Sequence, residues 1–95
     1  MHALLVTVSI DPAGVAEAQE NLRTRVVPAV KQAPGLVAAY WLDPKPGSAG
    51  LEGFSVALFD TEENAKKAEE MAKSSPVPDS VKFTGFEIRG VLVST

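Results

Sequence analysis

Two aromatic side chains stand next to each other in the segment QAPGLVAAYWL, residues 32–42. Tyr40 and Trp41 are the only tyrosine and the only tryptophan of the chain. Each combines a large apolar ring with one polar group, so it serves either to fill a core or to line a small-molecule pocket. Because neighbouring residues of a strand point to opposite faces, we expect only one of the two rings in such a pocket.

Other residues that could do chemistry are few. His2 is the only histidine and the chain has no cysteine, so we expect no metal site and no thiolate nucleophile. His2 lies so close to the start that we expect it to be frayed and idle. Glu87 and Arg89 share one face of a predicted strand, which indicates a salt bridge across an interface or a solvated pair at an edge.

The segment PKPGSAGLEG, residues 44–53, is rich in glycine and proline. It lacks the Gly-Lys-Ser/Thr ending of a phosphate-binding loop, and it joins two predicted strands instead of opening a helix. We therefore expect a flexible hairpin, or a lid over the mouth of a pocket.

Composition places further bounds on the function. A chain of 95 residues predicts one domain, residues 1–95. The net charge of −3 comes without a basic cluster, which argues against nucleic-acid binding. No apolar run reaches about 18 residues, so we expect no membrane span. The start reads as a strand instead of a signal peptide, and we expect a cytoplasmic protein.

Hydrophobic periodicity predicts six elements. Residues 3–10 alternate as a strand, and residues 13–33 follow a helical stripe after Asp11 and Pro12, with a kink near Arg25–Pro28. Strands are expected at 36–43, 54–60 and 83–93, and a second helix begins after the capping residue Thr61. The order β-α-β-β-α-β predicts an α+β, ferredoxin-like fold, a four-stranded antiparallel sheet with two helices on one face.

The sheet face away from the helices is also expected to be partly apolar. If Leu4, Val6 and Val8 face the helices, the first strand offers Ala3, Leu5 and Thr7 to the other side. On the last strand Phe86, Ile88 and Leu92 are expected inward, and Val91 and Val93 outward beside Glu87 and Arg89. An open apolar face of this size is unusual on a monomer, so we expect a homodimer through the sheet.

Strand alternation also predicts how the aromatic pair divides. Leu36, Ala38, Tyr40 and Leu42 form the more continuously apolar set. This places Tyr40 under the helices and Trp41 on the sheet face shared with the second copy, unless a bulge exchanges the two faces.

Three motifs resemble a known group of proteins. Pro34-Gly35 after a helix, the Tyr40-Trp41 strand and the run Phe59-Asp60-Thr61-Glu62-Glu63 are similar to elements of the dimeric α/β-barrel superfamily, which includes the antibiotic-biosynthesis monooxygenases. The resemblance implies a dimer and a cavity in which an electron-rich aromatic molecule reacts with oxygen without a cofactor. The second helix lacks the histidine that such enzymes often carry, and Ala57 stands where an acid is often found.

Two functions follow from these observations. The first is a cofactor-independent, monooxygenase-like enzyme acting on a small aromatic or quinone-type molecule. The alternative is a non-catalytic small-ligand binder or a stress-responsive interaction module, with a partner subunit of a larger enzyme as a weaker option. The aromatic residues expected at the ligand are Tyr40, Trp41, Phe54, Phe59 and Phe86, with Phe83 as a further candidate.

Overall fold

The computed structural model describes residues 1–47 and 50–95. Its strands are β1 (His2–Ile10), β2 (Leu36–Gly47), β3 (Gly50–Phe59) and β4 (Val81–Gly90). Its helical segments are a 3₁₀ turn (Pro12–Gly14), α1 (Val15–Asn21), a π-helical turn (Leu22–Val26), α2 (Val27–Lys31) and α3 (Glu62–Ser74).

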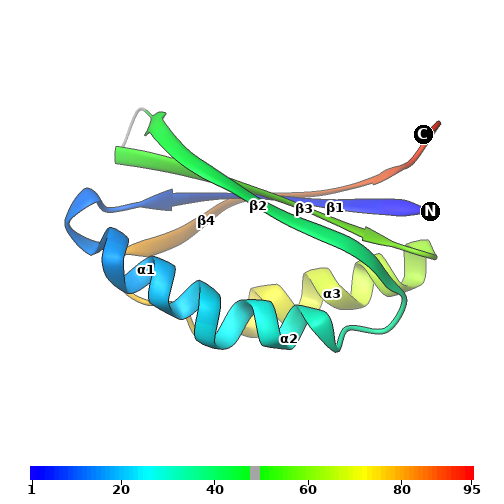
Figure 1. The fold of residues 1–95 in the computed structure, drawn as a ribbon, viewed down its shortest axis with the longest axis horizontal. Helices are drawn as coiled ribbons and strands as arrows, with labels where there is room; N and C mark the ends of the chain where they lie inside the picture. Colours follow the sequence, from blue (N-terminus) through cyan, green and yellow to red (C-terminus); the bar gives the residue numbers. More distant parts are fainter. Residues whose placement is uncertain (48–49) are drawn as a thin grey trace.

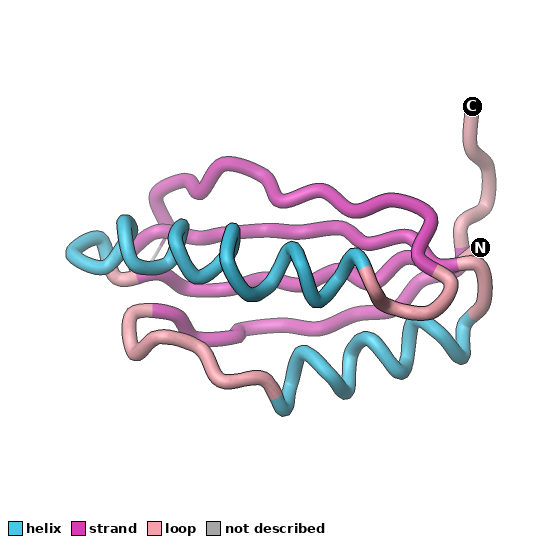
Figure 2. Tube along the Cα trace, turned by 60° about the horizontal axis from the view of Figure 1, so that its bottom comes forward, coloured by secondary structure: helices cyan, strands magenta, loops and turns pink. Residues whose placement is uncertain are grey.

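The four strands pair antiparallel in the order β2-β3-β1-β4 (Figure 1). The continuous helix from α1 to α2 and the separate helix α3 both cover one face of this sheet, and the other face carries no helix (Figures 1 and 2). This order and these connections are those of a ferredoxin-like fold, as the sequence predicts.

The first helix is irregular at the place where the sequence predicts a kink. Pro28 has no N–H and would leave the Thr24 carbonyl without its usual partner. Instead of bending sharply there, the chain widens into the π-helical turn, in which the Val27 N–H donates to the Leu22 carbonyl five residues earlier. The start is as expected, because the Asp11 carboxylate accepts a hydrogen bond from the Ala13 N–H at 3.0 Å.

The hairpin between β2 and β3 is longer than the sequence predicts. Residues 44–47 and 50–53, expected as loop, continue the two strands, with Lys45 opposite Glu52 and Pro46 opposite Leu51. Prolines are tolerated here because β2 is an edge strand, whose outer side needs no ladder hydrogen bonds. The tip at residues 48–49, part of the predicted lid, lies outside the described residues.

The last strand is shorter than predicted at its C-terminal end. It ends at Gly90, opposite His2, because β1 begins there and offers no further partner residues. One more hydrogen bond joins the Val91 N–H to the Met1 carbonyl at 2.9 Å. Leu92 and Val93 beyond it are 100% and 81% exposed, so they do not contribute to either sheet face as expected.

The packed core lies where β1, β3 and α3 meet. Leu4, Phe59 and Ala65 are the hydrophobic side chains that are fully buried among residues 1–47 and 50–95. Partly buried aliphatic and aromatic side chains surround them, among them Ala33, Leu36, Ala57, Ala68 and Ile88. Within the same ranges, no helix combines the length and the apolar composition needed to cross a membrane.

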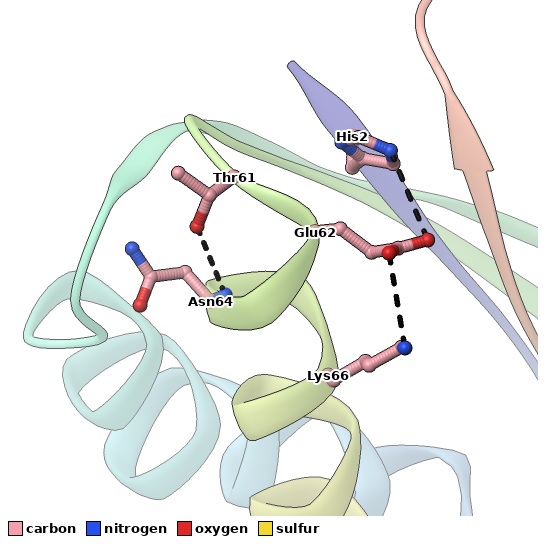
Figure 3. Close-up of polar contacts among 5 residues, drawn as sticks. All are labelled: His2, Thr61, Glu62, Asn64 and Lys66. Carbon is pink, nitrogen blue, oxygen red and sulfur yellow. Dashed lines mark hydrogen bonds and ion pairs between the residues drawn. The ribbon is translucent and has the colours of Figure 1, made fainter.

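Helix α3 begins beside the packed core, and its first turn is stabilised by a side-chain cap. The Thr61 hydroxyl accepts a hydrogen bond from the Asn64 N–H at 3.1 Å, as the sequence predicts for a capping residue (Figure 3). Glu62 follows in the first turn and lies 3.8 Å from the Lys66 ammonium. A carboxylate at this end of a helix is stabilised by the helix dipole.

Replacing the cap tests how much this helix start contributes to stability. Thr61→Ala removes the acceptor for the Asn64 N–H, and we expect it to lower the free energy of unfolding by about 1 kcal/mol. Urea denaturation measures the change. Thr84→Ala, at an exposed position of β4, is the matched control and should leave the midpoint unchanged. Equal midpoints for Thr61→Ala and the unmodified protein would contradict the role of the cap.

Candidate functional site

A cavity of about 330 Å³ lies between the sheet and the two helices. Its floor is the helix-facing side of the sheet, including Leu4, Val6 and Val8 of β1, and its other walls come from α1, α2, α3 and the segment that follows α3. Its volume is at the lower end of the range of small-ligand sites, roughly 300–1,000 Å³. Most of its lining is aliphatic or aromatic.

Small side chains on facing elements leave this space open. The helix-facing positions of β3 carry Gly53, Ser55 and Ala57 in succession. The other walls carry alanines of the three helices, namely Ala18, Ala29, Ala68 and Ala72, and Ala33 just after α2. Gly53 is also buried, and a Cβ there would lie 2.8 Å from a methyl carbon of Val8. The floor beside Val8 therefore requires glycine, while Ser55 and Ala57 determine how much volume remains above β3.

The structure reverses the predicted placement of the aromatic pair. Trp41 lines the cavity, whereas Tyr40 is 59% exposed on the open face of the sheet, opposite Val56. The cause is a bulge at the start of β2, where Leu36 pairs with Phe59 and Ala38 pairs with Leu58. Val37 has no partner on β3, so Ala38 to Leu42 lie on the faces opposite to those expected from Leu36, up to a second register shift between Leu42 and Lys45.

The phenylalanines divide between cavity, core and open face. Phe59 is 1% exposed and lines the cavity at its packed end. Phe54 borders the cavity, but it alternates with Gly53 and Ser55, so its ring belongs to the open face.

Phe83 and Phe86 have different neighbours, although both face the helices. A register shift in β4 places Phe83 opposite Val8 and Phe86 opposite Val6. Phe83 lines the cavity. Phe86 does not line the cavity and packs against the core cluster instead. The centroids of its ring and of the Phe83 ring are 5.0 Å apart, and the Lys73 ammonium lies 5.2 Å from the centroid of the Phe86 ring. Of the five predicted ligand residues, Tyr40 and Phe86 therefore lie outside the cavity lining.

Polar groups are few in this lining. Gln19, Asp43 and Ser75 are exposed and lie where the cavity opens to solvent, whereas Asn21 of α1 and Ser55 of β3 are half-buried. Asp43 is the only residue with an ionisable side chain among the described lining residues. The interior is therefore suited to an uncharged molecule, since an unpaired charge transferred into apolar surroundings is strongly destabilised.

His2 is not frayed, contrary to expectation. It belongs to β1, opposite Phe59 and Gly90, and its Nε2 lies 4.0 Å from a carboxylate oxygen of Glu62 (Figure 3). Its Nδ1 is buried and has no hydrogen-bond partner among the described residues. No group of three histidine, cysteine, aspartate or glutamate side chains gathers in a metal-binding arrangement within the described ranges.

Glu87 and Arg89 form an ion pair within β4, with 3.1 Å between the Arg89 Nε and a Glu87 carboxylate oxygen. Both side chains are more than half exposed on the open face of the sheet. They lie on the side of the sheet away from the cavity, so they take no part in its chemistry.

Comparisons with known proteins give likenesses in structure but none in sequence. No family model matches the chain, and no curated protein matches it in sequence. The chain is similar in structure to a monooxygenase from the gene ActVA-Orf6 of Streptomyces coelicolor, crystallised in complex with nanaomycin D. The match covers 99% of this chain and 92% of the other, at 18% identity and a TM-score of 0.49.

An identity of 18% concerns the arrangement of the backbone and carries no conclusion on activity or substrate. The assignment of the fold rests on the strand order and connections described above.

Filling the cavity tests where Trp41 lies. Ala18→Leu adds volume from α1, and we expect it to raise the free energy of unfolding by about 0.5–2 kcal/mol and to shift Trp41 fluorescence to shorter wavelengths. Ala16→Leu, on the exposed side of the same helix, is the control and should change neither quantity. If Trp41 lay on the open sheet face, its emission would be the same in both variants.

Proposed function

We propose that this protein binds a small, neutral, mainly apolar molecule in the cavity between its sheet and helices. The observation that supports the proposal is the combination of a ligand-sized volume with an uncharged, apolar interior. The lining small side chains supply the space, and Trp41, Phe59 and Phe83 supply aromatic surface against which a planar ring can pack.

The lining supports binding more strongly than turnover. Acid–base catalysis requires a titratable group within hydrogen-bond reach of the reacting atom. Asp43 is exposed at the opening of the cavity, and the Tyr40 phenol lies on the other side of the sheet. A cofactor-independent oxygenase, which the sequence resemblance implies, would show itself by oxygen consumption when a bound aromatic ligand is supplied, and a pure binder would consume none.

A neutral fluorescent probe tests ligand binding directly. N-phenyl-1-naphthylamine becomes brighter in apolar surroundings, and we expect the unmodified protein and Ala16→Leu to bind it equally. Ala18→Leu should bind it at least about tenfold more weakly, a loss of about 1.4 kcal/mol, because the added side chain occupies the cavity. Absence of binding to the unmodified protein, or unchanged binding to Ala18→Leu, would count against the proposed function.

Protein isolated directly from cells offers a second test of binding. Native mass spectrometry should detect an additional mass that disappears on denaturation. The same experiment on Ala18→Leu should show less of that mass than on Ala16→Leu.

We infer that the open face of the sheet packs on a second copy of the chain. Tyr40, Leu42 and Phe54 are exposed there, and Leu42 is directly opposite Phe54 on the neighbouring strand. Large contiguous apolar patches on a protein surface are typical of interfaces. A twofold arrangement would place the same apolar patch of β2 and β3 against itself, and such self-complementary contacts are the commonest in homo-oligomers.

A charge introduced into this patch tests the assembly. Tyr40→Glu would bury an unpaired carboxylate between the two copies, and we expect it to shift the protein from dimer to monomer. Ala16→Glu adds the same charge on the exposed side of α1 and should leave the dimer intact. Light scattering over a range of concentrations gives the mass, and a monomer mass for the unmodified protein would contradict the inferred dimer.

A further inference from the structure

Helix α3 contributes one large side chain to the wall of the cavity. Its lining residues are Ala68, Met71 and Ala72, which lie on one side of the helix at spacings of three and four. Met71 is at the same time 46% exposed to solvent. A side chain that both lines the cavity and is exposed to this extent lies at the rim of the cavity, between its interior and the solvent.

Met71 also has an unusual place among the sulfur-containing residues of the chain. The sequence has no cysteine, and its other methionine is Met1. Met1 is 45% exposed, so the two residues are about equally accessible to a small oxidant from solvent. Met1 does not line the cavity. Position relative to the cavity is therefore what distinguishes the two methionines.

Oxidation changes the chemistry of the Met71 side chain and nothing else in the wall. The thioether sulfur attacks one oxygen of hydrogen peroxide, so an S–O bond forms, the O–O bond breaks and water leaves. The sulfur is oxidised to a sulfoxide, and the peroxide is reduced. The thioether is apolar and flexible, whereas the sulfoxide is polar.

We propose that Met71 is an oxidation site through which peroxide lowers the affinity of the cavity for its apolar ligand. The sulfoxide oxygen is hydrated at the rim, and an apolar molecule that covers it removes this water without replacing its hydrogen bonds. Enzymatic reduction returns the side chain to the thioether, so the change is reversible. The effect on binding rests on the proposed function, whereas the site of oxidation rests only on the exposure of Met71.

Peroxide treatment followed by a binding measurement tests the proposal. The protein is treated with hydrogen peroxide, catalase removes the excess, and peptide mass spectrometry locates the added oxygen on Met71 and Met1. We expect the oxidised protein to bind N-phenyl-1-naphthylamine about tenfold more weakly than untreated protein, a loss of about 1.4 kcal/mol. Methionine sulfoxide reductases A and B, which reduce one sulfoxide epimer each, should together restore the affinity.

Two substitutions assign the effect to Met71. Met71→Leu removes this sulfur and keeps Met1, so its affinity for the probe should be the same before and after peroxide. Met71→Gln carries a permanent polar group of similar length and should bind the probe weakly without any peroxide. Circular dichroism of the oxidised, unmodified protein should show that its secondary structure is retained.

The outcomes separate this proposal from the proposed function. Unchanged affinity of protein that carries the Met71 sulfoxide, an equal loss in Met71→Leu, or a loss that accompanies unfolding would overturn the role of Met71 although untreated protein binds the probe. Oxidation of Met1 without oxidation of Met71 would overturn the site itself. Failure of untreated protein to bind the probe would overturn the proposed function and the effect on binding together.

Discussion

The helix-facing side of β3 determines where this protein is packed and where it is open. Its last position carries Phe59, which is buried with Leu4 and Ala65 where α3 begins. The preceding positions on that face, Gly53 to Ala57, carry almost no side-chain volume. Protein interiors are normally filled to the density of an organic crystal. β3 is an inner strand of the sheet, and its small side chains lie beneath the helices. Side chains at the edges of the sheet therefore do not fill the space above it.

Local signals in the sequence are sufficient for much of the fold. Alternation in β1 correctly assigns Leu4, Val6 and Val8 to the helix side, and Asp11 and Thr61 mark the two helix starts. The order of the elements then leaves few antiparallel arrangements, of which the ferredoxin-like one is observed.

The faces of β2 could not be predicted from the same signals. Period-two reasoning assumes an uninterrupted strand, and one unpaired residue reverses the assignments that follow it until the next irregularity. Here that residue is Val37, which has a high intrinsic preference for regular strands and gives no sign of a bulge. The preceding turn was predictable: Gly35 has a φ of +74°, and its carbonyl accepts a hydrogen bond from the Asp60 N–H at 2.9 Å. The turn fixes where β2 begins, but not which residue is left without a partner.

The walls of the cavity were missed for a different reason. Alanines such as Ala18 and Ala68 follow the predicted helical stripes, and stripes of small residues normally indicate close packing between elements. A stripe of small residues packs closely only when the facing element carries large side chains that fill the space between them. The signal that could have revealed the space is the coincidence of small residues on both sides of it, since Ala18 of α1 lines the same cavity as Gly53, Ser55 and Ala57 of β3. That coincidence depends on the pairing of distant segments, which a single sequence does not supply.

A small core also connects ligand binding and assembly to stability. A chain of this length buries only about 60–65% of the surface that its unfolded form exposes, and here the fully buried hydrophobic side chains of the described residues are limited to one end of the sheet. A molecule that binds only the folded chain raises the free energy of unfolding by about 2.7 kcal/mol when present at a hundred times its dissociation constant. A second copy on the open face stabilises the folded chain in the same way, to an extent that depends on protein concentration.

The cavity lies on one face of the sheet and Tyr40 on the other, and β2, which separates them, carries Trp41 next to Tyr40. The proposed ligand and the inferred second copy would therefore both contact β2, one on each face of the sheet.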